Sequence, residues 1–350
     1  MNDTIQINGE ILNYSSLRDK ENTTSNAWER EIYQFAAWLT ANDETPMIFN
    51  TSGSTGTPKS ILFSKRDVLE SAMRTIRYFH LRCDQQFFLC LPAAFVAGRM
   101  MIARAWASGA NLIAVKPSLN PLNCIELPSK VDFAAFTPPQ IEAAIKDGYK
   151  SELEKINTII IGGGVTNKSL QSLLLGMSNN IYQTYGMTES LTHVAVKKLS
   201  HPQDDYYQSV SSDIYFTTGP ENSLIVHVNN KKLYTTDQVQ LLSPQSFIWL
   251  GRKDHVINSG GLKIHPEQIE ATIIKAGILN ETRFYVSAAD DAQWGERPCL
   301  ISLDDISDDQ LKAINQILEK HHQIKKAIRV KGFEYTPTGK LIRKKYTGSY

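Results

Sequence analysis

Short apolar runs alternate with helical patterns through the first half of the chain, and this alternation most constrains the fold. The run Thr158–Ile161 is rich in β-branched residues, which is typical of a strand buried on both faces of a parallel sheet. The segment Arg66–Phe79 instead places its apolar residues on one face of a helix. Strands and helices in alternation predict a layered α/β domain.

The same patterns give the expected order of elements in this domain. Residues 1–24 are polar and show no periodicity from which an element is predicted. Ser25 can cap a helix whose apolar residues share one face, namely Trp28, Ile32, Phe35 and Leu39. Further helices are predicted at about 97–107 and 139–145. The expected strands are Met47–Phe49, Phe87–Leu91, Leu112–Val115, Phe133–Phe136 and Thr158–Ile161.

The pattern changes at Asp213, where short strands separated by turn residues predict an antiparallel β subdomain over about 213–250. These strands are Ile214–Phe216, Leu224–Val228, Lys232–Tyr234, Val239–Leu242 and Phe247–Leu250. A smaller, mobile α+β domain is expected over 256–350, after a hinge at 251–255 that ends a core domain of residues 1–250. Its expected elements are helices at Pro266–Ala276 and about Asp308–His321, and strands at Phe284–Ala288 and Cys299–Leu303.

Composition excludes several classes of protein. A formal charge of +1 argues against nucleic-acid or membrane-surface binding, which would need a basic excess. The cysteines show no C-x-x-C spacing, so neither zinc nor a disulfide framework is predicted. Arg99 and Arg104 interrupt the longest apolar region, and the N-terminus lacks the pattern of a signal peptide. We therefore expect a soluble, cytoplasmic protein without stable membrane insertion.

A loop rich in glycine and hydroxyl groups follows the strand at Met47–Phe49. Glycines let backbone N–H groups turn toward one point, and a lysine adds positive charge, which together suit a polyphosphate. The spacing is not that of a Walker A loop, because Pro58 precedes Lys59. A polar surface turn is the alternative interpretation. The predicted phosphate-binding residues are Thr51, Ser52, Gly53, Ser54, Thr55, Gly56 and Lys59.

The string T-S-G-S-T-G-T-P-K resembles the phosphate-loop signature of the acyl-adenylate-forming (AMP-binding) superfamily. This superfamily includes acyl- and aryl-CoA ligases, carrier-protein adenylation domains and luciferases. Further motifs follow in the family's order, so the resemblance covers most of the chain from Phe49 to Lys345. It implies ATP, Mg²⁺ and coenzyme A as ligands, a small-molecule carboxylic acid as substrate, and no nucleic-acid partner. A homodimer stays open.

Two motifs supply the nucleotide site that the resemblance implies. Gly162, Gly163 and Gly164 follow a buried strand, where absent side chains let a flat adenine ring approach the backbone. The string Gln183–Glu189 resembles the family's Y-G-x-T-E motif. In it Tyr185 offers a face to adenine, Thr188 a hydroxyl to the α-phosphate, and Glu189 a carboxylate to Mg²⁺. Thr188 and Glu189 are therefore candidate catalytic residues, and Glu189 the candidate metal ligand.

The C-terminal third carries the remaining motifs. Tyr234–Asp237 resembles the ribose-binding motif Y-x-T-G-D without its glycine, and places Asp237 on the ribose. Arg252 is implied to donate to ribose or phosphate, and Asp254 to be the hinge. Two further sites are implied by the resemblance: Gly260 and Gly261 where the thiol arm approaches, and Lys340 as the adenylation lysine. His321 and His322 are interpreted as a solvated helix end, not a metal site.

The segment Leu91–Trp106 matches the family's acyl-pocket motif P-x-x-H-x-x-G, with Phe95 in the histidine position and Gly98 as the glycine. A buried guanidinium is costly unless it is paired, so Arg104 predicts a substrate with a second carboxylate. The segment resembles the o-succinylbenzoate–CoA ligases of menaquinone synthesis, of which this would be a short form. Alternatively, Arg99 or Arg104 faces solvent or a structural acid.

The implied reaction has two steps. The carboxylate attacks the α-phosphorus of ATP to give an acyl-adenylate and pyrophosphate, and a thiol then takes the acyl group. Rotation about Asp254 would exchange Lys340 for the Gly260–Gly261 face between the steps. A stand-alone adenylation protein that loads a carrier-protein thiol, a ligase for another acid, and a nucleotide-binding protein without catalysis stay open as alternatives.

Overall fold

The computed structural model describes residues 2–50, 60–200, 205–334 and 341–345. The chain forms two compact units by its internal contacts. The first comprises residues 1–166 and 170–214, and the second comprises 167–169 and 215–350. The second unit thus includes the β subdomain that the sequence analysis assigns to the core domain, and the predicted boundary near residue 250 stays a prediction.

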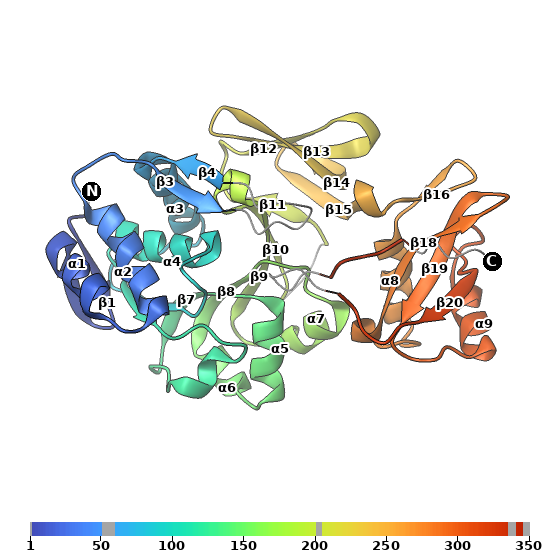
Figure 1. Ribbon diagram of the computed structural model, residues 1–350, viewed down its shortest axis with the longest axis horizontal. Coiled ribbons are helices and arrows are strands. Elements are labelled where there is room, and N and C mark those ends of the chain that lie inside the picture. The colour runs from blue at the N-terminus through green and yellow to red at the C-terminus, as the bar shows by residue number, and fades with distance from the viewer. Residues whose placement is uncertain (1, 51–59, 201–204, 335–340, 346–350) are drawn as a thin grey trace. The chain divides into compact units, whose positions relative to one another are not determined.

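The first unit is built on a mainly parallel sheet in the order β11-β10-β9-β8-β7-β5-β6-β1-β2 (Figure 1). The parallel pairs run from β1 through β6, β5, β7 and β8 to β9, and β2, β10 and β11 are antiparallel. The strands are β1 Thr4–Ile7, β2 Glu10–Asn13, β5 Gln86–Leu89, β6 Asn111–Ala114, β7 Val131–Phe136, β8 Ile156–Ile161, β9 Asn180–Gly186, β10 His193–Lys198 and β11 Tyr207–Ser209.

Helices cover this sheet. All six residues of β7 are buried, as expected for a strand with both faces covered. In Figure 1, α4 lies above β7 and β8, and α5 and α6 lie below them. The helices are α1 Tyr14–Thr23, α2 Ala27–Thr40, α3 Lys65–Tyr78, α4 Val96–Ser108, α5 Pro138–Lys146, α6 Lys150–Glu154 and α7 Lys168–Leu174. Short 3₁₀ turns lie at η1 Pro121–Cys124 and η2 Thr188–Ser190.

A separate two-stranded hairpin consists of β3, Met47–Asn50, and β4, Ser60–Phe63. It confirms the strand predicted before the phosphate loop. The Ser60 hydroxyl and the Asn50 amide oxygen lie 2.9 Å apart across the pair. The hairpin therefore joins the two ends of the predicted phosphate loop, whose residues 51–59 lie outside the described part of the chain.

The second unit contains two antiparallel assemblies. Strands β12 to β15 pair in sequence order, and a smaller sheet has the order β17-β16-β19-β18 with β20 parallel to β19. The strands are β12 Tyr215–Thr218, β13 Ser223–Val228, β14 Lys231–Ser243, β15 Ser246–Arg252, β16 Ile257–Ser259, β17 Leu262–Ile264, β18 Phe284–Asp291, β19 Gly295–Ser302 and β20 Lys326–Arg329. The helices are α8 Pro266–Lys275 and α9 Asp308–Ile317, with 3₁₀ turns η3 Pro220–Asn222, η4 Lys253–His255 and η5 Glu281–Arg283.

The predicted fold class, a large α/β part followed by antiparallel β and a small α+β part, is confirmed. Four details of the prediction were wrong. Residues 4–23 form β1, β2 and α1, whose strands are too short for a periodicity to stand out. The helix expected after Ser25 has Asn26 as its N-cap residue, without a side-chain capping hydrogen bond. The strands expected at 232–234 and 239–242 are one strand, β14, interrupted by bulges. Helix α9 ends at Ile317, before the two histidines.

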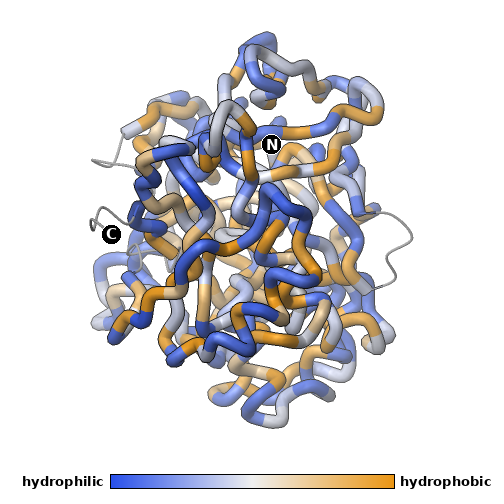
Figure 2. Tube along the Cα trace, turned by 90° about the vertical axis from the view of Figure 1, so that its right-hand side faces the viewer, coloured by the Kyte–Doolittle hydropathy of each residue, from blue (hydrophilic) through white to orange (hydrophobic). Residues whose placement is uncertain are grey.

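Among the described residues, every helix is too short or too polar to traverse a bilayer. Hydrophilic and hydrophobic residues are interspersed along the trace (Figure 2).

Candidate active site

The glycine loop after β8 is fixed by the neighbouring strand β9. The Gln183 side chain accepts from Thr166 N and donates to Gly164 O, both at 2.8 Å. The Thr184 hydroxyl donates to Ile161 O at 3.0 Å. Because β8 and β9 are parallel neighbours, their carboxyl ends lie at one edge of the sheet. Side chains of β9, the strand that carries the next motif, thus fix the path of Gly162–Gly164 at this edge.

That next motif leaves the carboxyl end of β9 as a tight turn, η2. The buried Ser190 hydroxyl lies within hydrogen-bond distance of Thr192 O, at 2.7 Å, and of Met187 O, at 2.9 Å, so it ties both ends of the turn together. The carboxylate of Glu189 is exposed, and Thr188 is half-buried. The structure therefore brings the predicted residues Gly162–Gly164, Tyr185, Thr188 and Glu189 to the same edge.

Gly186 is required by a close backbone approach at this turn. A Cβ there would lie 2.4 Å from Thr192 O and 2.6 Å from His193 Cα. The two strand ends could not approach each other with any side chain at this position. The glycine of the motif therefore sets the path from β9 into the Thr188–Glu189 turn.

The predicted acyl-pocket residues lie at and along α4. Phe95 precedes the helix and is 45% exposed. Gly98 packs against the preceding chain so closely that a Cβ would lie 2.2 Å from Pro92 O. Arg104 is 1% exposed, and burial lowers its pKa to about 9. Phe95 is therefore exposed, Gly98 packs against the backbone, and Arg104 is a buried charge.

Arg104 has no acidic partner among the residues that the structure describes. One terminal nitrogen donates to the Thr192 hydroxyl at 2.7 Å, and the other lies 3.5 Å from the Met101 sulfur. Its Nε is buried without a hydrogen-bond partner in the described part. Among the described residues, Arg104 therefore neither faces solvent nor pairs with an acid, in contrast to the alternative interpretation of the sequence.

Arg99, in contrast, has a structural environment. Its guanidinium donates to Ile48 O at 2.7 Å and to Ala93 O at 3.0 Å. It also lies 4.8 Å from the ring centre of Phe49, a cation–π distance. Arg99 thus ties α4 to β3, the strand that enters the predicted phosphate loop.

In the second unit, the ribose and hinge motifs meet across β14 and β15. Asp237 pairs in register with Arg252, and Trp249 Nε1 donates to the Asp237 carboxylate at 3.0 Å. The Arg252 guanidinium donates to Thr236 Oγ1 at 2.8 Å and to Asp254 at 2.7 Å. Thr236, Arg252 and Asp254 therefore form one polar group, and Asp237 lies opposite Arg252 in the strand pair, although these residues come from two separate sequence motifs.

The missing glycine of the ribose motif corresponds to an irregularity in β14. Ser223 pairs with Gln238 and Ile225 with Tyr234, so the intervening residues of β14 leave the ladder with β13. The Thr235 hydroxyl donates to Leu224 O at 2.9 Å within this bulge. A bulge re-aims side chains without requiring a glycine, so Asp237 keeps its place beside Arg252.

The remaining predicted residues fall into two groups. Gly260 and Gly261 form the exposed turn between β16 and β17, with φ of 57° and 86°. Lys340, like Thr51–Lys59, lies outside the described residues. The chain on either side of Lys340 is held together, since Ile342 N donates to Glu334 O at 2.9 Å.

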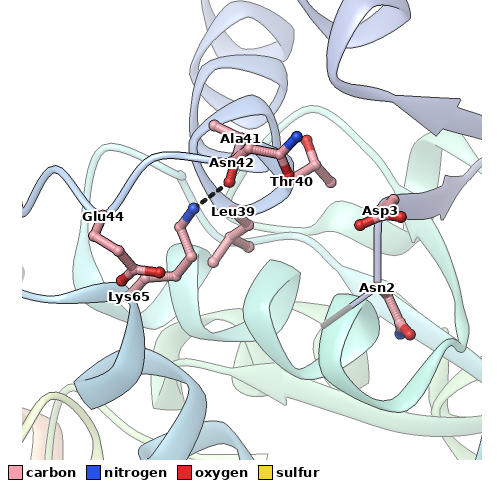
Figure 3. A pocket seen from close by; sticks show the side chains of 8 residues that line it. All are labelled: Asn2, Asp3, Leu39, Thr40, Ala41, Asn42, Glu44 and Lys65. Atoms are coloured by element: carbon pink, nitrogen blue, oxygen red, sulfur yellow. Dashed lines mark hydrogen bonds between the residues drawn. The ribbon is translucent and has the colours of Figure 1, made fainter.

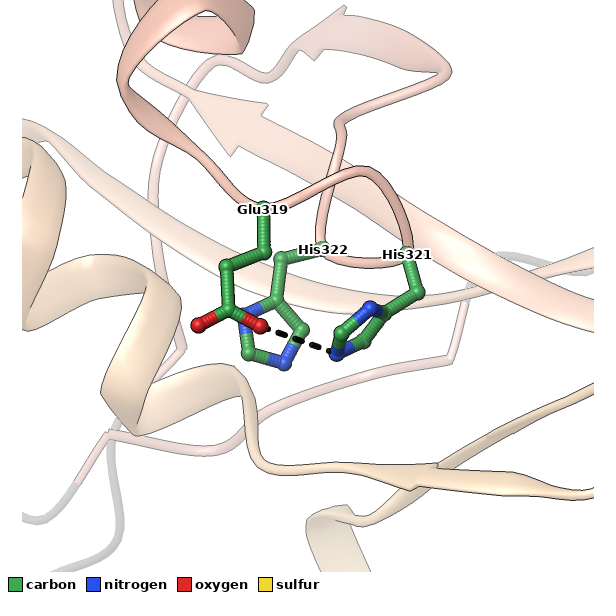
Figure 4. A group of neighbouring side chains, drawn as sticks. All are labelled: Glu319, His321 and His322. Atoms are coloured by element: carbon green, nitrogen blue, oxygen red, sulfur yellow. Dashed lines mark ion pairs between the residues drawn. The ribbon is translucent and has the colours of Figure 1, made fainter.

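The exposed carboxylate of Glu189 is a suitable ligand for a magnesium ion. This carboxylate accepts no hydrogen bond from the described residues, so its oxygens are available to a hard cation. Glu319, His321 and His322 also gather ligand atoms within 4.8 Å of one another in the turn after α9 (Figure 4). Glu319 and His321 are largely exposed and already paired at 3.2 Å, so the interpretation as a solvated group is kept.

A small surface pocket lies elsewhere in the first unit and contains none of the motif residues. It is lined by Asn2, Asp3, Leu39, Thr40, Ala41, Asn42, Glu44 and Lys65 (Figure 3). The buried Lys65 ammonium donates to Ala41 O at 2.6 Å and to Asp43 O at 2.8 Å, which closes the C-terminal end of α2. We therefore assign Lys65 a structural role at the C-terminal end of α2.

The sequence model of the AMP-binding enzyme family matches residues 5–214. The chain belongs to this family, which confirms the resemblance inferred from the motifs.

Several curated relatives are named 2-succinylbenzoate–CoA ligase. The chain is 25% identical over 266 residues to a 2-succinylbenzoate–CoA ligase from Haemophilus influenzae, a match that covers 71% of this chain and 57% of the relative. It is 22% identical over 337 residues to the enzyme of that name from Bacillus mycoides, covering 86% and 69%. The chain thus spans less than two thirds of the length of the Haemophilus relative.

Solved structures share the fold. An acyl-CoA synthetase (AMP-forming)/AMP-acid ligase II-like protein from Dyadobacter fermentans aligns with a TM-score of 0.64 and 26% identity, covering 94% of this chain and 95% of the other. The o-succinylbenzoate CoA synthetase (MenE) from Bacillus subtilis, in complex with the acyl-adenylate intermediate OSB-AMP, aligns with a TM-score of 0.74 and 15% identity, covering 97% and 94%.

Proposed function

We propose that this chain is an AMP-forming ligase that activates a carboxylic acid with ATP and transfers the acyl group to the thiol of coenzyme A. Family membership supports the adenylation step. So does the grouping of Gly162–Gly164, Tyr185, Thr188 and Glu189 where two parallel strands end, the usual place for a nucleotide in an open α/β sheet. The curated relatives' name supports coenzyme A as the acceptor.

The observation that carries the choice of substrate is the buried Arg104. A guanidinium that is 1% exposed, with a buried Nε that lacks a described partner, is costly unless an anion joins it. A second carboxylate on the substrate would supply that anion. 2-Succinylbenzoate carries two carboxylates and occurs in the names of the curated relatives, so it is our proposed substrate.

The chemistry of the first step follows from charge. A carboxylate is a poor electrophile, and its attack on the α-phosphorus of ATP brings two anions together. Lys340, Thr188 and the loop Thr51–Lys59 would offset this charge with donors and cations as pyrophosphate leaves. A magnesium ion held by Glu189 would supply further positive charge. The product is an acyl-adenylate, whose AMP is a good leaving group.

The second step needs different groups at the same carbonyl. We propose that the small C-terminal domain turns about Asp254, so that Lys340 withdraws and the exposed Gly260–Gly261 turn faces the acyl-adenylate. At Gly261 an added Cβ would meet no described atom within 4 Å, which leaves room for a thiol-bearing arm, whereas at Gly260 it would lie 2.3 Å from the Trp294 ring. Thiolate attack then releases AMP and forms the thioester.

An ATP–pyrophosphate exchange screen tests this proposal. Exchange is expected with 2-succinylbenzoate and much less with aryl monocarboxylates and fatty acids. Added coenzyme A should then yield an acyl-CoA. Exchange without acyl-CoA formation would favour a carrier-protein thiol as acceptor, and no exchange with any acid would refute the adenylation proposal itself.

A further inference from the structure

A chain of polar contacts crosses the interior of the first unit from α3 to α4. The His193 ring, at the start of β10, lies 3.3 Å from Thr75 Oγ1 through Nε2 and 3.3 Å from Thr192 Oγ1 through Nδ1. Thr192 Oγ1 in turn accepts from Arg104 at 2.7 Å. Thr75, His193 and Arg104 are all buried, and Thr192 between them is half-buried.

The hydrogen bond from Arg104 constrains the direction of the others. A guanidinium only donates, so Thr192 Oγ1 accepts there and its own proton is free to point at His193 Nδ1. When that proton is donated to Nδ1, the ring is neutral and carries its proton on Nε2, facing Thr75. We infer this tautomer for the chain of contacts.

The surroundings keep this imidazole neutral. Burial, and then the positive charge of Arg104, hold the pKa of His193 well below its ordinary value. A protonated ring would turn Nδ1 into a donor, and Thr192 Oγ1 would then face two cationic donors. The neutral ring instead fixes the Thr192 hydroxyl with its lone pair toward the guanidinium.

The Thr192 contact leaves most of the Arg104 donors uncommitted. Within the described part of the chain, one terminal nitrogen is oriented by Thr192, the other contacts only the weak acceptor of Met101, and Nε has no partner. A carboxylate is best bound by two parallel N–H groups of a guanidinium. Because Thr192 fixes one terminal nitrogen, the remaining N–H groups of the Arg104 guanidinium keep a fixed orientation toward an incoming carboxylate.

We propose that Thr192 and His193 are positioning residues that orient Arg104 to select substrates with a second carboxylate. This inference rests on the proposed function. It also joins two motifs, because Thr192 closes the turn that carries Thr188 and Glu189, while Arg104 lies on α4. Recognition of the second carboxylate is thereby linked to the turn at which the nucleotide is expected.

The test compares Thr192→Val with Thr192→Ser in the full-length chain. Valine keeps the shape and removes the hydroxyl, whereas serine keeps the hydroxyl. Exchange kinetics are measured with 2-succinylbenzoate and with the analogue that lacks the ring carboxylate. We expect Thr192→Val to raise KM for 2-succinylbenzoate about tenfold or more, because a hydrogen bond to a charged group is lost. Its kcat, and kcat/KM for the analogue, should change less than about threefold, and Thr192→Ser should behave as wild type.

A second pair of variants addresses the imidazole. His193→Asn retains an amide oxygen in place of the Nδ1 acceptor, and His193→Leu retains none. We expect the asparagine variant to keep more of the preference for the dicarboxylate than the leucine variant. Equal preference in the two variants would refute the role of His193 as an orienting acceptor.

Two results for Thr192→Val would overturn the inference but not the adenylation proposal. One is an equal fall in kcat/KM for both acids, and the other is an unchanged KM for 2-succinylbenzoate. A wild-type protein that uses both acids equally well would overturn the inference and the substrate assignment together. Absence of exchange with every acid would instead refute the proposed function. The three failures are therefore distinguishable.

Discussion

Arg343 forms a two-pronged ion pair with Glu270. One terminal nitrogen lies 2.8 Å from Glu270 Oε2, the other contacts Oε1 and donates to Val286 O at 3.1 Å. Burial would lower the pKa of Arg343, but the charge and hydrogen bonds of Glu270 outweigh it and raise that pKa. Glu270 ends the motif at the start of α8, so the pair fastens the segment that follows Lys340 to this helix.

Glu270→Gln should therefore destabilise the C-terminal part of the chain. Both side chains of the pair are about 15% exposed, and removing one charge of a buried pair costs about 3–5 kcal/mol. Thermal melting should show a clear loss. The matched control is Glu319→Gln, since the Glu319 side chain is 72% exposed and should change stability by less than about 0.5 kcal/mol. Equal melting temperatures for both variants would contradict the structural role of the pair.

Lys340→Ala should abolish formation of the acyl-adenylate and leave transfer from a synthetic acyl-adenylate to coenzyme A largely intact. The lysine is needed only where two negative groups approach each other. Lys344→Ala is the control, because Lys344 forms an exposed pair with Glu334. Equal loss in both half-reactions would point to a misfolded C-terminal domain instead.

Glu189→Gln should slow adenylation and increase the Mg²⁺ concentration required, without changing the melting temperature. The substitution removes one charge at nearly constant shape from an exposed side chain. Titrating Mg²⁺ in the exchange reaction measures the effect. Wild-type rates at limiting Mg²⁺ would exclude Glu189 as a metal ligand.

Much of the fold could be predicted because buried strands leave strong local patterns. The run at Thr158–Ile161 is such a case, and β8 spans Ile156–Ile161. β1, at Thr4–Ile7, was missed because its four residues bury only Ile5 and Ile7, too little alternation to distinguish from a loop. The merging of two predicted strands into β14 was also unpredictable, since bulges depend on the pairing partners.

The site residues divide in the same way. Gly162–Gly164 and Glu189 could be found because each motif is contiguous in the sequence. Gln183 and His193 could not be given roles, because their partners lie at separations of 17–19 and 118 residues. Only the Gln183 position, inside a recognised motif, offered a signal. Contacts between distant segments depend on the assembled fold, which no local pattern encodes.

Gly98→Ala should destabilise the first unit. The added Cβ would meet the backbone at Pro92, so α4 must shift, at a cost of about 1–3 kcal/mol. For a domain of this size the melting temperature should fall by about 2–4 °C per kcal/mol. Gly176→Ala is the control, because a Cβ added at Gly176 would meet no other atom within 4 Å among the described residues. If Gly98 acts only by lining the acyl pocket, alanine will change KM and leave the melting temperature unchanged.

Arg104→Leu should separate stability from substrate recognition. Leucine removes a buried charge that has no described acidic partner, and replacing such a group with an apolar side chain is often neutral or stabilising by about 1–4 kcal/mol. The same change removes the partner of the second carboxylate, which should cost about 2–5 kcal/mol in binding. We therefore expect an unchanged or higher melting temperature together with a fall in kcat/KM for 2-succinylbenzoate of about thirtyfold or more.

The analogue without the ring carboxylate provides the comparison for Arg104→Leu. Its kcat/KM should be low in the wild type and nearly the same in the variant, because it offers no anion to the guanidinium. Arg104→Lys keeps the charge but not the planar fork, so it should recover only part of the loss. A variant that activates 2-succinylbenzoate as well as wild type would remove the main physical support for a dicarboxylate substrate. The adenylation proposal would survive that result, since it depends on the edge formed by β8 and β9 and not on α4.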